Sequence, residues 1–187
     1  MPVGQGRTGG LRRALDGLYW LSGAAAALCL VGTCVLMLAQ AGGRSLGTQV
    51  RGADDITAWL CAATAFFALA HTFKSGDFVR VGLFIDNLRG ASRRRLEIVA
   101  LSVSLAFVAY MAYWLGFKVY DSWAFNDMSQ GILVVPLWIP QLSLPLGAIA
   151  FTIAIADELV AVLAGRTPAY EVAAEERRAR GDFSETV

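Results

Sequence analysis

The sequence predicts an all-α integral membrane protein with four transmembrane helices, both termini in the cytoplasm, and an amphipathic interfacial helix between spans 2 and 3. Three observations lead to this class. Hydrophobic residues make up 56% of the 187 residues and charged residues only 17%, whereas a soluble domain normally carries about 25% charged residues. The charges are clustered, which leaves long windows without any. Lys and Arg are also divided unequally among the segments between these windows.

The windows without Asp, Glu, Lys or Arg cover residues 17–43, 56–73, 98–117 and 128–156. A helix needs about 20 predominantly apolar residues to cross a hydrocarbon core about 30 Å thick. Backbone groups in that core must be hydrogen-bonded within the protein, which favours helices. We therefore expect spans near 18–41, 56–73, 98–117 and 137–156. They would form one membrane domain over residues 15–165, between an N-terminal tail (1–14) and a C-terminal tail (166–187).

The first apolar run follows Arg7, Arg12 and Arg13, as the apolar part of a secretory signal would. It is longer than the roughly 7–15 residues of such a signal. We therefore interpret it as a retained first span.

Orientation is predicted from the positions of the cationic residues. The N-terminal tail, the 74–95 connector and the C-terminal tail carry three, six and four Lys or Arg residues, which is thirteen of the sixteen. The other two connectors carry only Arg44, Arg51 and Lys118. Cytoplasmic loops are enriched in Lys and Arg, so both termini and the 74–95 connector are expected in the cytoplasm.

Neither the cysteines nor the histidine suggest a cofactor. Cys29, Cys34 and Cys61 form no C-x-x-C pair and have no metal-ligand spacing. Haem in membrane proteins is commonly held by axial His or Met ligands, and a single histidine, His71, rules out a bis-histidine site within this chain. We expect the cysteines to pack in the spans and His71 to be an interfacial or capping residue. No cofactor and no metal site are predicted.

No enzyme activity is predicted either, and no residue is assigned a catalytic role. The phosphate-binding pattern G-x-x-x-x-G-K-[ST] is absent. A carboxylate inside a span would suggest a function by default. Asp157 and Glu158 come nearest to this, but they follow the fourth window, where we expect the span to leave the bilayer.

The connector between spans 2 and 3 has a helical apolar pattern. Val81, Phe84, Ile85 and Leu88 recur at i, i+3, i+4 and i+7, which is one helix face. With Lys74, Arg80 and Arg93–Arg95 nearby, residues 76–88 are expected to lie on the cytoplasmic interface beside anionic headgroups. Such a segment would contact lipid or a partner protein. A plain connector is the alternative.

The beginning of the fourth span is rich in proline. Trp138 is expected near the membrane interface. Pro140 can occupy the first helical turn, where no backbone donor is lost, and Pro145 is expected to kink the helix. In the first two spans, Gly23 with Ala27 and Ala58 with Ala62 are four residues apart, a spacing that allows close helix approach.

These features together resemble the small membrane subunit of tripartite ATP-independent periplasmic (TRAP) transporters, the DctQ-like family. The similar elements are the acidic pair Asp54–Asp55, "KSGDFVRVGLFIDNL" (74–88) and "GILVVPLWIPQLSLPLG" (131–147). The resemblance covers about residues 15–165. Phe78, Gly82 and Ala58 depart from residues frequent in the family.

The resemblance implies a scaffold subunit in the bacterial inner membrane. Its partners would be a large membrane subunit with the substrate and sodium sites and a periplasmic protein that captures an organic anion such as a carboxylate. The residues expected at a partner or lipid interface are Asp54, Asp55, Lys74, Arg80, Val81, Phe84, Ile85, Leu88, Arg93, Arg94, Arg95, Trp138 and Pro140. The alternatives are a self-contained small carrier and an assembly subunit of another membrane complex.

Overall fold

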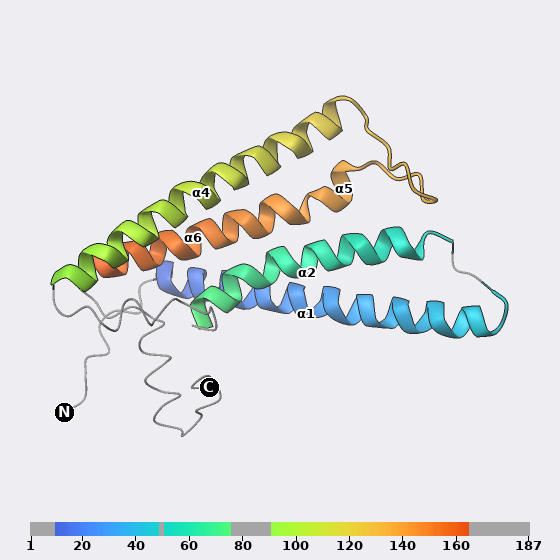
Figure 1. Ribbon diagram of the computed structural model, residues 1–187, viewed down its shortest axis with the longest axis horizontal. Helices are drawn as coiled ribbons and strands as arrows, with labels where there is room; N and C mark the ends of the chain where they lie inside the picture. The colour runs from blue at the N-terminus through green and yellow to red at the C-terminus, as the bar shows by residue number, and fades with distance from the viewer. Residues whose placement is uncertain (1–9, 49–50, 76–90, 165–187) are drawn as a thin grey trace, which may run out of the picture.

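The computed structural model describes residues 10–48, 51–75 and 91–164. These residues form the helices α1 (Gly10–Ser45), α2 (Ala53–Ser75), α4 (Ala91–Ala124), α5 (Trp138–Gln141) and α6 (Ser143–Leu163), shown in Figure 1. Outside the helices, Met128 and Pro136 pair in one isolated bridge. Four segments are long and apolar enough to cross a membrane: Arg13–Ser45, Ala53–Lys74, Arg94–Ala124 and Trp138–Leu163. The predicted all-α class with four such helices is confirmed.

The helices lie side by side in the order α1, α2, α6, α4, so that α1 and α4 form the two edges (Figure 1). The central helix is the best covered. In α6, 44% of the most apolar window is buried, against 17% in each of the other three. The core is accordingly built on α6, where Ala154 and Ile155 are buried and Phe151 meets Phe73 of α2 edge to face, with ring centroids 5.5 Å apart.

The chain crosses the layer four times. The beginning of α1, the end of α2, the beginning of α4 and the end of α6 gather at one end, which we call the terminal end (Figure 1). The loops after α1 and α4 lie at the opposite end, the loop end, where the α1–α2 and α4–α6 pairs diverge (Figure 1). The described cationic residues of the N-terminal tail and of the 74–95 connector therefore lie at one end of the molecule, together with the end of α6.

The helices run past the windows from which they were predicted. Charged residues next to an apolar window can continue the helix into the interfacial region, where water satisfies their side chains. At 34 residues, α4 is about 50 Å long at 1.5 Å per residue, well beyond the thickness of a hydrocarbon core. The fourth helix continues to Leu163, so Asp157 and Glu158 belong to α6 and precede its last residue by roughly one to two turns.

The fourth span is interrupted where its prolines predict a distortion. Leu142 separates α5 from α6, and Pro145 is the third residue of α6. Pro145 has no N–H for the carbonyl of Gln141, and its ring displaces that carbonyl. The helix therefore breaks one turn before Pro145, and α5 bends away from the axis of α6 (Figure 1).

Small residues set two close helix contacts. A Cβ on Gly147 of α6 would lie 2.6 Å from the backbone carbonyl group of Phe66 on α2, and one on Gly23 of α1 would lie 2.8 Å from the imidazole of His71. Gly23 thus packs closely, as its spacing suggests. Ala27 and Ala58 are exposed, so at most one residue of each predicted small-residue pair lies in a close contact between helices.

Candidate functional site

Most of the charged side chains with partners in the described residues lie at the two ends of the helix layer. At the loop end, the acidic pair joins three segments. Asp54 Oδ1 accepts a hydrogen bond from Gln40 Nε2 of α1 at 2.9 Å. Asp55 Oδ2 accepts one from the backbone N–H of Leu133 at 3.4 Å. The two carboxylates therefore connect the first turn of α2 to the end of α1 and to the loop between α4 and α5.

Two glycines allow the loop to approach so closely. Gly131 leaves no room for a Cβ beside the Asp55 carboxylate, and Leu133 covers Gly52 in the same way. Gly52 also has φ +79°, a conformation that side-chain-bearing residues rarely adopt. Both acids lie in the first turn of α2, where negative charge is favourable near the positive end of the helix dipole. The paired acid is thus a structural junction in this protein.

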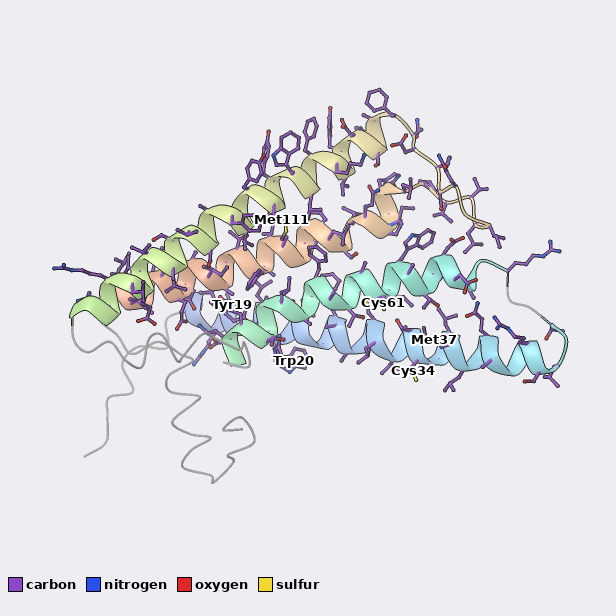
Figure 2. All side chains as sticks on the ribbon, in the orientation of Figure 1. Tyr19, Trp20, Cys34, Met37, Cys61 and Met111 are labelled. Atoms are coloured by element: carbon purple, nitrogen blue, oxygen red, sulfur yellow. The ribbon has the colours of Figure 1, made fainter. Side chains whose placement is uncertain are left out.

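At the terminal end, Lys74 connects three helices. Its Nζ lies 2.6 Å from Asp157 Oδ2 and 3.9 Å from Glu158 Oε2 of α6. It also lies 5.3 Å from the ring centroid of Tyr19 on α1, a cation–π contact. Glu158 is only 2% exposed, so the nearby ammonium partly compensates a buried carboxylate. Tyr19 lies where α1 meets α2 and α6 (Figure 2).

His71 and Arg94 hold neighbouring helix ends. His71 Nδ1 lies 3.3 Å from the Tyr19 carbonyl oxygen, a bond in which the Nδ1–H tautomer is the donor. Arg94 Nη2 donates to the carbonyls of Val162 and Leu163, at 3.3 and 3.1 Å, and so caps the C-terminal end of α6. Arg95 is exposed.

The other predicted interface residues either belong to α5 and the first turn of α4 or lie outside the described residues. Trp138 and Pro140 are half-buried in α5, which packs against α4 and α2. Arg93 belongs to the first turn of α4. Arg80, Val81, Phe84, Ile85 and Leu88 lie outside the described residues, as does the whole predicted interfacial helix.

Several hydroxyl groups inside the spans bond to their own helix. Four threonine hydroxyls donate to the carbonyl four residues earlier at 2.8–3.0 Å; they belong to Thr33, Thr64, Thr72 and Thr152. Ser22 Oγ crosses to the Phe67 carbonyl at 2.6 Å and joins α1 to α2. Within the described residues, no group of three His, Cys, Asp or Glu side chains could hold a metal ion. These hydroxyls stabilise helices and do not line a polar path.

Residues Gly43–Gly47 read G-R-S-L-G and fit the G-x-S-x-G pattern of hydrolase nucleophiles. That pattern acts on a sharp turn between a strand and a helix. Here it closes α1, and Ser45 Oγ donates to the Ala41 carbonyl at 3.2 Å. His71 lies near the other end of the layer, beside Tyr19. The local structure therefore does not support a nucleophile at Ser45.

Sequence reasoning missed the partnership of Lys74 with Asp157 and Glu158. A basic residue ending one apolar window and two acids ending another are compatible with an ion pair, but this signal is weak without knowing that α2 packs on α6. It also missed Gly131 and Gly147, because a glycine in an apolar window gives no sign of what packs against it.

One family model matches the chain. The model for the DctQ component of tripartite ATP-independent periplasmic transporters matches residues 33–165, which is 133 of 187 residues. No curated protein matches the chain. The matched region begins within α1 and includes α2, α4, α5 and α6. It therefore contains the acidic pair as well as Lys74, Asp157 and Glu158, whereas Tyr19 precedes it. The chain belongs to the DctQ family, the DctQ component of tripartite ATP-independent periplasmic transporters.

Proposed function

We propose that this chain is the small scaffold subunit of a TRAP-type secondary transporter in the bacterial inner membrane. It pairs with a large membrane subunit and a periplasmic binding protein, and the complex takes up an organic anion, such as a carboxylate, coupled to sodium. The observation that carries the proposal is the family match over residues 33–165. It is a match to a transporter component, and a component acts with partners.

The distribution of polar groups supports a scaffold role. A transport pathway needs ionisable or polar side chains inside the spans, facing a cavity or one another. Here the acidic pair lies at the loop end, and Lys74, Asp157 and Glu158 lie near the terminal end. Between these ends, four threonine hydroxyls bond to backbone carbonyls of their own helices. Such a chain can position a partner without carrying the substrate itself.

The proposed orientation puts the terminal end in the cytoplasm. Arg94 and Lys74 lie there, next to exposed Arg95, and cations near span ends favour the cytoplasmic side. Residues 76–90 separate α2 from α4 in the sequence, so this orientation assigns the predicted segment 76–88 to the cytoplasmic interface. Their apolar face would meet lipid or the large subunit.

A self-contained carrier would use a membrane carboxylate, and Glu158 is the best candidate because it is buried within α6. However, it lies near the end of α6, and Lys74 Nζ is 3.9 Å away. A carboxylate beside a fixed cation is poorly suited to bind and release a second one. The scaffold function is therefore the better supported of the two.

Reconstitution in liposomes tests the proposal. The chain alone, under an inward sodium gradient, should show no uptake of radiolabelled organic anions. Addition of the large subunit and the loaded binding protein should produce sodium-dependent uptake. Uptake by the chain alone would overturn the scaffold function, and failure of the wild-type chain to co-purify with the large subunit would overturn the proposed complex.

A further inference from the structure

The outer side of α4 carries a cluster of aromatic rings. Tyr110, Tyr113, Trp114 and Phe117 are 64%, 67%, 49% and 44% exposed. The residues that α4 buries, including Leu101, Val108 and Ala112, repeat on the opposite side of the helix, where it packs on α6. Figure 2 shows rings along the side of α4 that faces away from α6. We call these four residues the aromatic face.

The rings of the aromatic face support one another. Trp114 contacts Tyr110, Tyr113 and Phe117 edge to face, with centroid distances of 6.2, 6.0 and 5.7 Å. Rings in such contacts are held in place, which lowers the entropy lost when a partner covers them. Tyr and Trp are also the residues most enriched among those that dominate binding energy at interfaces. The aromatic face therefore has the composition and the fixed ring positions that are typical of a protein–protein interface.

The depth of the two tyrosines distinguishes this face from an aromatic belt. Trp and Tyr normally lie at the headgroup level. The uncharged window of α4 covers residues 98–117, so Tyr110 lies roughly 4 Å from its centre and Tyr113 roughly 8 Å, at 1.5 Å per residue. The hydrocarbon half-thickness is about 15 Å. Helical side chains also lean toward the N-terminus, which directs both hydroxyls toward the centre and away from the nearer interface.

Lipid tails provide no hydrogen-bond acceptor for the hydroxyls of Tyr110 and Tyr113. Among the described residues, neither tyrosine hydroxyl has a hydrogen-bond partner, and hydrocarbon contains no acceptor. A polar group left unsatisfied there is costly. A covering protein helix can supply carbonyl or side-chain acceptors at this depth.

The opposite edge of the layer provides an internal comparison. On α1, Leu28, Val31, Val35 and Leu38 are 74%, 59%, 59% and 68% exposed. They follow the i, i+3, i+7, i+10 spacing, and they are aliphatic. Trp20 and Cys34 also lie on the side of α1 that faces away from α2 (Figure 2), and both are exposed. The four aliphatic side chains on α1 carry no polar group and can lie in lipid without loss of a hydrogen bond. The aromatic face carries the hydroxyls of Tyr110 and Tyr113, which cannot.

We propose that the aromatic face of α4 is the surface on which the large membrane subunit docks, through a helix that offers hydrogen-bond acceptors to Tyr110 and Tyr113. The outer face of α1 remains in lipid. This inference rests on the proposed function, because it takes the large subunit as the occupant. It assigns the partner to one edge of the layer.

Site-specific photocrosslinking in the assembled complex tests the assignment. Benzoylphenylalanine is placed at Tyr110 in one variant and at Val31 of α1 in the matched control, each co-expressed with the large subunit. Illumination of membranes should give an adduct with the summed mass of the two subunits from Tyr110 and none from Val31. An adduct from Val31 only, a product twice the mass of this chain, or no protein adduct from either position would overturn the assignment.

A second measurement addresses the hydroxyls alone. The double variant Tyr110→Phe/Tyr113→Phe keeps the rings and should retain the large subunit roughly five- to tenfold less well in detergent titration. Unchanged thermal unfolding of the isolated variant shows that its fold is intact. Equal retention by variant and parent would overturn the hydrogen-bonding role. If the unmodified pair does not co-purify at all, the proposed function fails instead, and the two failures are thereby distinguished.

Discussion

Lys74 of α2 is joined through its side chain to two other helices. Its ammonium group faces Asp157 and Glu158 of α6 and the Tyr19 ring of α1. Breaking a buried ion pair costs about 3–5 kcal/mol. Because the Asp157 side chain is 34% exposed, we expect Lys74→Met to lower the free energy of unfolding by about 2 kcal/mol. Thermal unfolding in detergent should shift down by roughly 4–8 °C.

The matched control for Lys74 is Lys118→Met, which removes an exposed cation from α4. Its melting temperature should stay within about 2 °C of the parent, as expected for an exposed charge. Equal melting temperatures for Lys74→Met and the parent would show that the ion pair does not hold α2 to α6.

Asp55 governs the loop between α4 and α5 through one backbone hydrogen bond, from Leu133 N–H. Asp55→Ala removes the acceptor, so hydrogen exchange at the Leu133 amide should accelerate by about tenfold, the equivalent of roughly 1.4 kcal/mol. The neighbouring substitution Asp54→Ala breaks only the contact with Gln40 and should leave Leu133 protected. Protection of Leu133 in both variants would contradict the assigned role of Asp55.

At the scale of elements, Gly147 allows α6 to lie against α2. A methyl group at this position would meet the Phe66 backbone, which cannot rotate away as a side chain can. We expect Gly147→Ala to destabilise the protein by about 1–3 kcal/mol, the usual range for overpacking. Differential scanning fluorimetry in detergent measures the change.

Gly116→Ala supplies the comparison for Gly147. Nothing lies within 4 Å of a Cβ at Gly116 in α4, and alanine favours helix by about 0.8–1.0 kcal/mol over glycine. This variant should be as stable as the parent or more so. If both alanines had the same effect, close approach at Gly147 would not explain the result.

At the scale of the whole molecule, the four crossings put the beginning of α4 and the loop after it at opposite ends (Figure 1). In a variant with Cys29, Cys34 and Cys61 replaced by alanine, Arg93→Cys should react with an impermeant maleimide only in inverted vesicles. Gln130→Cys should react only in spheroplasts. Labelling of both positions from the same side would contradict the number of crossings, and reversed labelling would contradict the orientation.

The four apolar helices and a distortion of the fourth one at Pro145 could be predicted from local sequence alone. Charge-free windows of membrane length, such as residues 98–117, admit few other structures, because backbone in hydrocarbon must bond to itself. A proline ring excludes the carbonyl four residues earlier wherever it occurs. Both constraints are local, so they can be recognised from the sequence without knowing the fold. The acidic pair and the cationic residues were singled out from the sequence, but what they contact was not.

Which helices are neighbours became clear only from the folded chain, and the contacts of the polar residues depend on that arrangement. Lys74 meets Asp157, 83 positions away in the chain, because α2 packs on α6. Asp55 reaches the loop at Leu133, 78 positions away, for the same kind of reason. All four helices are apolar enough to cross a membrane, and hydropathy alone does not say which of them are neighbours in the layer. That order depends on where small residues such as Gly147 permit close backbone contact, a property of two surfaces together and not of either segment alone.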